Sequence, residues 1–262
     1  MDLGLTDKSA LVLASSSGLG RATALAFARE GADVTLFARR EAECRHAQEE
    51  MQKQTGRTAH VVLGDLTKAA DIQRAVDEAA ARFGRLDILV NNCGGPPAGT
   101  FDAFDDAAWQ GAFDLTLLSY VRATRAALPH LRKAGRGWIL NFVSSSVKAP
   151  LDLLLLSNTF RMGVVGFTKT LASEVGPQGI LVNALGPGRI QTDRLVQLDS
   201  ARAKRTNSTP EAVRAEMAKL IPLGRYGEPE EFARTAVFLC SPANSYISGQ
   251  TLLVDGGMVK AY

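Results

Sequence analysis

The feature that most constrains the fold is the alternation of short apolar segments with longer helical patterns along the chain. The short segments are nearly continuous apolar runs, which is typical of strands that are covered on both faces. Strands that alternate with helices form right-handed β-α-β units and a parallel sheet. We therefore expect an α/β fold of three layers, a doubly wound, parallel, seven-stranded sheet with helices on both faces. The predicted strands cover residues 10–13, 33–38, 59–63, 86–91, 138–143, 180–184 and 252–254, and the predicted helices cover 19–29, 41–53, 68–83, 105–133, 153–175, 211–219 and 229–239.

The chain's 262 residues can bury a sizeable core, so we expect residues 1–262 to form a single domain. Residues 189–210 are the one long stretch without a strand or helix pattern, and they are rich in Arg, Ser, Thr and Asp. A segment this long in a compact domain is usually a lid or a binding loop. We therefore expect an irregular loop there, within a substrate lid at about residues 189–220.

Composition excludes several classes of protein. The formal net charge of +3 is too small to indicate nucleic-acid binding, and no Lys/Arg run is present. The three cysteines are scattered without metal-ligand spacing, so we expect no metal site, no disulfide framework and a reducing cytoplasm. The N-terminal residues lack a signal-peptide pattern, and the longest purely apolar run, residues 153–156, is far too short to span a membrane.

A small-residue turn follows the first predicted strand and opens the first predicted helix. At this position a doubly wound sheet binds a pyrophosphate, because small residues let the backbone approach and the helix N-terminus offers free N–H groups. An ordinary tight turn is the alternative, but the position favours a dinucleotide cofactor. The candidate cofactor-binding residues are Ala14, Ser16, Ser17, Gly18, Leu19 and Gly20.

The end of the second predicted strand indicates which dinucleotide is bound. An acidic residue here would bind the ribose 2′-hydroxyl of NAD, whereas an Arg accommodates the 2′-phosphate of NADP. The sequence has Arg39 and Arg40 and no acid. Arg39 is the candidate phosphate ligand, and the alternative is a solvated pair of arginines at a helix start. We therefore expect NADP(H) to be favoured over NAD(H).

With these residues in view, the chain resembles the short-chain dehydrogenase/reductase family, and within it the 3-oxoacyl-[acyl-carrier-protein] reductase-like members. The resemblance implies a Rossmann-type fold and a homotetramer or homodimer that pairs through the two long helices. It also implies cofactor contacts at Asp65 and Leu66 for the adenine, and at Asn92 and Gly94 after the fourth strand. Further contacts near the nicotinamide are implied at Pro187, Gly188 and Thr192. The motifs that carry the resemblance are Asp65-Leu66, Asn91-Asn92-Cys93-Gly94, Asn183 with Pro187-Gly188 and Thr192, Ile221 to Arg225, Gly227 to Glu231, Ser248-Gly249-Gln250 and Val254 to Gly257.

The same comparison shows where the sequence departs from the family pattern. Ala14 stands at the first glycine of the family's turn, where its methyl group is expected to weaken cofactor binding. The family's catalytic Asn, Ser, Tyr and Lys correspond here to Thr116, Ser145, Ser157 and Arg161. Only the serine is retained, with Ser144 as the alternative if the gap is counted differently.

These substitutions change the chemistry that the site can perform. A serine hydroxyl is a much weaker acid than a phenol, and loss of a positioned general acid typically lowers the rate about 10²–10⁴-fold. Arg161 can still hydrogen-bond a cofactor ribose, but it cannot release a proton as Lys can; a structural ion pair is the alternative. A desolvated Lys148 is a hypothetical proton donor, against a solvated loop lysine, and Asp152 is a weaker candidate. Thr116 either takes part in the site or only packs within its helix.

Two functions therefore stay open at this point. The first is an oxidoreductase that interconverts a small-molecule carbonyl and alcohol, with Ser145 polarising the carbonyl. The second is a non-catalytic dinucleotide-binding module, such as a redox sensor or an inactive partner subunit. The substrate cannot be read from the sequence, and the lid arginines Arg189, Arg194, Arg202 and Arg205 face either an anionic substrate or water.

Overall fold

The sheet is the centre of the structure, a computed structural model that describes residues 1–261. It has seven parallel strands in the order β3-β2-β1-β4-β5-β6-β7, so the chain reverses its direction of winding between β1 and β4. This confirms the doubly wound sheet that the alternating pattern predicts. The strands are β1 (Ser9–Leu13), β2 (Asp33–Ala38), β3 (His60–Leu63), β4 (Ile88–Asn91), β5 (Gly137–Phe142), β6 (Ile180–Pro187) and β7 (Thr251–Val254).

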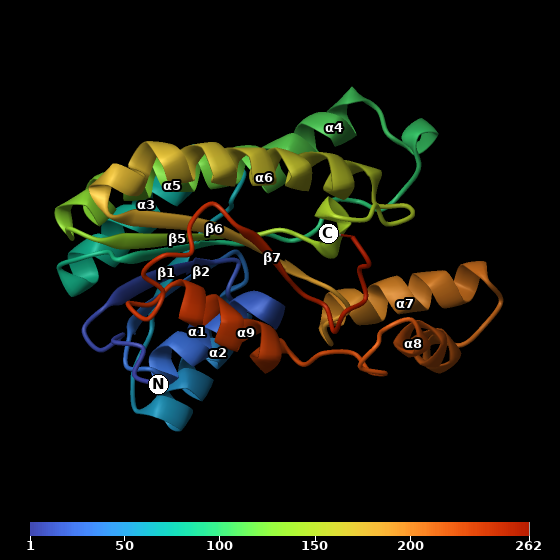
Figure 1. Cartoon of the computed structure of the whole chain (residues 1–262), viewed down its shortest axis with the longest axis horizontal. Coiled ribbons are helices and arrows are strands. Elements are labelled where there is room, and N and C mark those ends of the chain that lie inside the picture. Colours follow the sequence, from blue (N-terminus) through green and yellow to red (C-terminus); the bar gives the residue numbers. More distant parts are fainter. Residues whose placement is uncertain (262) are drawn as a thin grey trace.

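Helices cover both faces of the sheet, and Figure 1 shows the resulting three layers. One apolar core lies between the sheet and α1, α2 and α9, and a second lies between the sheet and α3, α5 and α6. Because β1, β4 and β5 are buried on both sides, their sequences are apolar throughout rather than alternating. The helices in these two layers are α1 (Gly18–Arg29), α2 (Glu41–Thr55), α3 (Ala69–Phe83), α5 (Ser119–Lys133), α6 (Leu155–Val175) and α9 (Pro229–Leu239).

The long helical stretch predicted at residues 105–133 is interrupted. It comprises α4 (Asp106–Phe113), a π-helical turn (Asp114–Leu118) and then α5. Such single π turns are rare and are frequently found at functional sites. Short 3₁₀ turns occupy Phe101–Ala103, Ser145–Val147 and Gly176–Gln178. No helix within residues 1–261 has both the length and the apolar character needed to cross a bilayer.

The prediction of an irregular segment at residues 189–210 is wrong. Residues Asp193–Arg205 form helix α7, and α8 (Pro210–Lys219) follows it. Start and stop signals are present: Thr192 caps the helix by accepting from the Leu195 N–H, and basic residues occupy its last turn. The polar composition of α7 hides these signals. Its Leu195 and Ala203 side chains join a small third core with residues of α8, the Tyr226 loop and Met258. The two helices project beyond the strand ends, at the right of Figure 1.

Candidate functional site

The turn after β1 has the geometry of a phosphate-binding turn. Ser17 precedes α1 without capping it through its side chain, so the first N–H groups of the helix stay available to a ligand. Gly18 has a positive φ of 55°, and a Cβ on Gly20 would lie 2.4 Å from the Ala14 carbonyl oxygen. Ala14 itself adopts φ 48°, a left-handed conformation that glycine tolerates better than alanine. The turn therefore fits a pyrophosphate, although it is strained at Ala14.

The other predicted turn residues support this arrangement in different ways. The Ser15 hydroxyl donates to the Val12 carbonyl and accepts from the Phe37 N–H, which fixes the turn to β2. Ser16 is buried at the turn, and Leu19 packs against the core beneath α1. Asn92 donates from its side-chain amide to the Ala14 carbonyl over 3.2 Å, joining the end of β4 to the turn.

Two arginines lie at the end of β2, and they have different partners. Arg39 is 76% exposed and lies 3.8 Å from a carboxylate oxygen of Asp65. Arg40 reaches the turn itself, because its guanidinium donates to the Ser17 hydroxyl over 3.3 Å and pairs with Glu43 at 2.9 Å. Arg40, which the sequence argument passes over, is thus tied to the phosphate turn.

Asp65 and Leu66 lie just beyond the end of β3. The Thr67 N–H, the main cause, helps to hold the pKa of the Asp65 carboxyl below its ordinary value. The Leu66 side chain is buried in the core, so a ligand here can contact only its backbone. Gly94 has open space around it, and a Cβ on Gly188 would lie 2.5 Å from Asp255. Pro187, the last residue of β6, pairs with Val254 of β7.

Asn91 and Asn141 hold the ends of β4 and β5 together. The two residues are paired in the sheet, and the Asn91 amide donates to the Asn141 side-chain oxygen over 2.7 Å. It also donates to the Thr124 hydroxyl on α5, and the Asn141 amide donates to Thr168 on α6. All four side chains are buried. This network fixes α5 and α6 relative to the strand ends, where the remaining candidate residues lie.

The predicted catalytic positions converge at these strand ends. Ser145 starts the 3₁₀ turn after β5 and is buried; the neighbouring Ser144 hydroxyl accepts from the Ser146 N–H, so it is engaged in capping the turn. Ser157 and Arg161 are four residues apart on α6 and therefore share one face of the helix. Each is only 7% exposed, and the Arg161 Nε donates to the Ser157 Oγ over 3.3 Å.

The Arg161 guanidinium is directed at protein groups on the inner side of α6. Its Nη1 donates to the Phe142 carbonyl over 2.8 Å, and its Nη2 lies 3.9 Å from the Cys93 sulfur. The Tyr120 hydroxyl of α5 is a further hydrogen-bond partner, and it donates to the same Phe142 carbonyl over 3.0 Å. No carboxylate within residues 1–261 forms an ion pair with Arg161. We call Ser157, Arg161, Cys93, Tyr120 and the Phe142 carbonyl the Arg161 cluster.

Burial shifts the pKa values of Arg161 and Tyr120 in this cluster. Burial by itself lowers the pKa of Arg161, but Cys93 and Tyr120 outweigh it and leave that pKa above its ordinary value. Burial is also the main reason that the pKa of the Tyr120 hydroxyl lies well above its ordinary value. Arg161 is therefore a buried cation without a carboxylate partner among the described residues, and it can stabilise negative charge that develops near Ser157.

Thr116 lies in the π-helical turn one helical turn before Tyr120. It is completely buried, and its hydroxyl has no hydrogen-bond partner among the described residues. Lys148 follows the 3₁₀ turn, but its side chain is exposed rather than desolvated, and Asp152 is exposed as well. The desolvation that the Lys148 hypothesis requires is therefore absent, and that part of the prediction is wrong.

The lid arginines have protein partners. Arg189 pairs with Asp199 at 2.8 Å, and Arg202 pairs with Glu216 at 3.1 Å. Arg194 donates to the Pro96 carbonyl across from α7, which ties the lid to the loop after β4. Arg205 is exposed at the end of α7. Thr192, at the start of α7, lies beside the phosphate turn. A Cβ built on Gly18 of that turn would be 3.7 Å from the Thr192 methyl group.

Sequence reasoning passed over several residues of this site. Tyr120 could have been found from its spacing, since it stands four residues after Thr116 and shares its helix face. The Phe142 carbonyl carried no signal, because a backbone acceptor has no sequence signature. Tyr226 was equally hidden, although its hydroxyl donates to Asp199 over 2.8 Å at the base of the lid.

Comparison with known proteins identifies the family. The profile of the family described as enoyl-(acyl carrier protein) reductase matches residues 13–259. A Streptomyces virginiae protein named as a ketoacyl reductase of the monensin polyketide synthase is 36% identical, covering 97% of both chains. The 3-oxoacyl-[acyl-carrier-protein] reductase of Chlamydia trachomatis is 33% identical, covering 97% of this chain and 98% of its own.

Solved structures agree with this result. L-Sorbose reductase from Gluconobacter frateurii, in complex with NADPH and L-sorbose, superposes with a TM-score of 0.95 at 33% identity, covering 100% of both chains. This solved structure has the same arrangement of strands and helices along the whole chain, as expected from the family resemblance in the sequence. The protein therefore belongs to the short-chain dehydrogenase/reductase family and is an oxidoreductase relative that resembles the 3-oxoacyl-[acyl-carrier-protein] reductases.

Proposed function

We propose that this protein is an NADP(H)-dependent reductase that converts a small-molecule carbonyl into an alcohol. The observation that carries the proposal is the hydrogen bond from the Arg161 Nε to the Ser157 Oγ. It places a buried cation directly behind a hydroxyl at the position where the family has its catalytic tyrosine. Ser145 lies at the end of β5, the strand whose last residue supplies the Phe142 carbonyl of the same cluster.

The residues present fit the cofactor. The uncapped N-terminus of α1 and the close approach allowed at Gly20 suit a pyrophosphate, and Arg40 beside Ser17 suits a 2′-phosphate. When bound, a reduced nicotinamide supplies the hydride for the carbonyl carbon. Thr192 and the ends of β6 and β4 would border that nicotinamide. L-Sorbose reductase, the relative with a TM-score of 0.95, is itself described in complex with NADPH.

The two serine hydroxyls would bind the substrate oxygen. Ser157 accepts from Arg161, so its own proton is available to a second acceptor, and Ser145 makes no hydrogen bond from its side chain within the described residues. Both hydroxyls can donate to a carbonyl oxygen, and the Arg161 charge strengthens that binding as the oxygen becomes negative. A serine does not release its proton readily, so water completes the protonation.

The experiment measures binding first and turnover second. Fluorescence titration with NADPH and NADH should give tighter binding of NADPH. Reduction of a 3-oxoacyl thioester, L-sorbose and simple ketones is then followed with the enzyme in excess over substrate. Slow reduction that Ser145→Ala abolishes supports the proposal. Failure to bind either nucleotide would refute it, because both hydride transfer and the module alternative require binding.

One observation favours a second candidate, a dinucleotide-binding module without catalysis. The Arg161 donors are occupied by the Phe142 carbonyl, Ser157, Cys93 and Tyr120, so few remain for a cofactor ribose. Such a module would bind NADPH in the same titration but oxidise none of it with any carbonyl in the panel. That outcome would replace the reductase proposal with a sensor or an inactive partner subunit.

Association and location are part of the same proposal. We infer that copies of the chain pair through the exposed sides of α5 and α6, where Met162 is 49% exposed. A cytoplasmic location stays a prediction from the cysteine pattern. Light scattering of the purified protein measures the number of copies, and a monomer that does not associate at micromolar concentration would contradict the pairing.

A further inference from the structure

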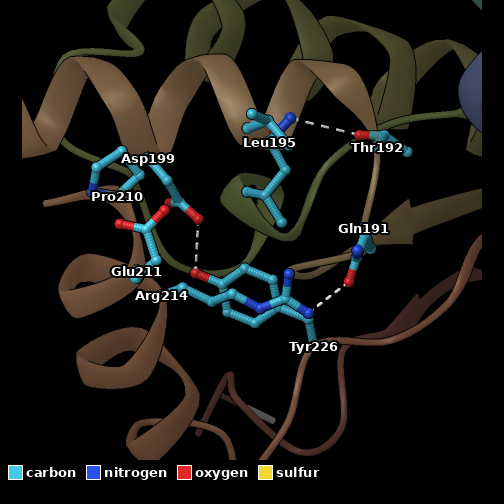
Figure 2. A pocket seen from close by; sticks show the side chains of 9 residues that line it. Gln191, Thr192, Leu195, Asp199, Pro210, Glu211, Arg214 and Tyr226 are labelled. Atoms are coloured by element: carbon cyan, nitrogen blue, oxygen red, sulfur yellow. Dashed lines mark hydrogen bonds between the residues drawn. The ribbon is translucent and has the colours of Figure 1, made fainter.

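A cavity of about 230 Å³ lies between the lid helices α7 and α8, apart from the Arg161 cluster. Figure 2 shows α7 above it, α8 beside it and the Tyr226 ring across its base. By volume the cavity matches roughly eight molecules of liquid water at about 30 Å³ each, which is room for a small organic molecule. Its lining residues are Gln191, Thr192, Leu195, Val196, Asp199, Pro210, Glu211, Arg214 and Tyr226.

The wall of the cavity is mostly apolar. Leu195 and Val196 come from α7, Pro210 starts α8, and the Tyr226 ring supplies an aromatic surface. Val196 is 56% exposed although it is a large hydrophobic residue. Together with Leu195 and the Tyr226 ring, Val196 gives the cavity the apolar lining that is common in ligand pockets.

The one buried carboxylate at this cavity is already neutralised. Asp199 accepts from the Tyr226 hydroxyl over 2.8 Å and pairs with Arg189 at 2.8 Å. Burial, which is the larger cause, and the hydrogen bond to Asp199 raise the pKa of Tyr226 to about 12, although Arg189 opposes them. Asp199, Arg189 and Tyr226 therefore form a closed, rigid base, and none of their charge is left for a ligand.

Arg214 differs from Arg189 and Arg202, because it has no carboxylate partner among the described residues, and it differs from Arg194 and Arg205 because it lies at the cavity. Its guanidinium lies over the Tyr226 ring, 5.2 Å from the centroid, and donates to the Gln191 side-chain oxygen. Both partners are neutral, and no acidic side chain in residues 1–261 forms an ion pair with Arg214. Figure 2 shows the guanidinium between Tyr226 and Gln191, at the edge of the cavity. A cation that two neutral groups hold in place is preorganised for an anion.

We propose that this cavity binds a small organic carboxylate, with its acid group paired to Arg214 and its apolar chain against Tyr226, Leu195 and Val196. The planar fork of an arginine matches a carboxylate in two parallel hydrogen bonds. Glu211, three residues before Arg214 on α8, carries a negative charge beside the cavity that repels a second anionic group. The site therefore favours a monoanionic carboxylate over an alkyl phosphate, which carries more negative charge.

This site requires nothing of the proposed hydride transfer, because none of its charged residues belongs to the Arg161 cluster. A ligand bound there would bridge α7, α8 and the Tyr226 loop and so hold the lid in one arrangement. Its binding is therefore measured directly, without turnover. Failure of the carboxylate site would leave the reductase proposal intact, and the reverse also holds.

The test uses the full chain and isothermal titration with hexanoate, its neutral isostere hexanamide, and hexyl phosphate. Hexanoate should bind most tightly. Arg214→Gln should weaken hexanoate about three- to tenfold, the effect of losing an exposed charge-assisted contact, and leave hexanamide unchanged. Glu211→Gln should tighten hexanoate, and the matched control Arg205→Gln, an exposed arginine on α7 outside the cavity, should change nothing. Arg214 and Arg205 are both exposed, so both variants should fold.

The location is tested by soaking crystals with 6-bromohexanoate, whose bromine should lie between α7 and α8. A bromine elsewhere, equal affinity for hexanoate and hexanamide, tighter binding of hexyl phosphate, or an unchanged affinity in Arg214→Gln would each overturn the proposal. Displacement of hexanoate by NADPH would also overturn it, because the cavity would then belong to the cofactor.

Discussion

The double substitution Ser157→Tyr with Arg161→Lys should raise the rate of the proposed carbonyl reduction. It restores a phenol as proton donor. It also replaces the guanidinium with an ammonium that is compact enough to lie beside the new tyrosine ring. A positioned general acid is worth about 10²–10⁴ in rate, or roughly 3–5 kcal/mol of barrier. Turnover should also become pH-dependent, falling as the phenol loses its proton, because neither Ser157 nor Arg161 titrates near neutrality.

The structure also sets the cost in stability. Lysine keeps the charge of Arg161 but cannot reproduce its fork, so it loses the contacts to the Phe142 carbonyl and Cys93. Two weakened hydrogen bonds cost about 1–3 kcal/mol, and the Phe142 carbonyl keeps the Tyr120 hydroxyl as a donor. For a chain of this length we expect the melting temperature to fall by roughly 2–4 °C per kcal/mol. Arg161→Lys alone should show this loss without any gain in rate.

The assay follows NADPH oxidation by absorbance at saturating NADPH, with the same carbonyl panel for every variant. Ser157→Phe with Arg161→Lys is the matched control, since it has the same ring without the hydroxyl. NADPH titration and circular dichroism establish that each variant binds cofactor and is folded. If the double variant is folded, binds NADPH normally and is no faster than the phenylalanine control, then the absence of a phenol does not limit the rate of reduction at this site, and the reasoning is refuted.

Three further predictions concern the turn and the lid. Arg40→Gln should weaken NADPH about tenfold and leave NADH nearly unchanged, whereas Arg39→Gln should have the smaller effect because Arg39 points to Asp65; nucleotide titration of both variants checks this. Ala14→Gly relieves the strain of a left-handed alanine, about 1–2 kcal/mol, but adds about 0.5–1 kcal/mol of chain entropy to the unfolded state, so the melting temperature should change little. Because the substitution removes the methyl group at the turn, NADPH should bind more tightly. Tyr226→Phe removes a donor to buried Asp199 and should lower stability by about 1–2 kcal/mol in thermal unfolding. The pKa of Tyr226 is about 12 in the folded state and about 10 in the unfolded state. The stabilisation from its hydroxyl is therefore complete below pH 10 and is lost as the pH rises toward 12. If the stability of the wild type did not decline relative to Tyr226→Phe over this range, the hydrogen bond from Tyr226 to Asp199 would be contradicted.

The sequence determined the layers and the position of the cofactor turn. Strand runs such as Ile88–Asn91 are apolar throughout, and only a sheet covered on both faces accommodates them. Gly18 and Gly20 follow the first strand directly, and that local order alone places a phosphate turn at the edge of the sheet. These features depend on neighbours in the chain, so they can be read in order along it.

Tertiary structure decided where the side chains at the catalytic positions point. The sequence indicates that Arg161 replaces a lysine, but only the packing of α5 and α6 on the strand ends brings Cys93, Tyr120 and the Phe142 carbonyl to it. Tertiary packing also decided that Arg214, unlike Arg189, lacks a carboxylate partner among the described residues. The physical reason is that hydrogen bonds and ion pairs depend on distances of a few ångströms between residues far apart in the chain, and the periodicity of a sequence carries no such distances.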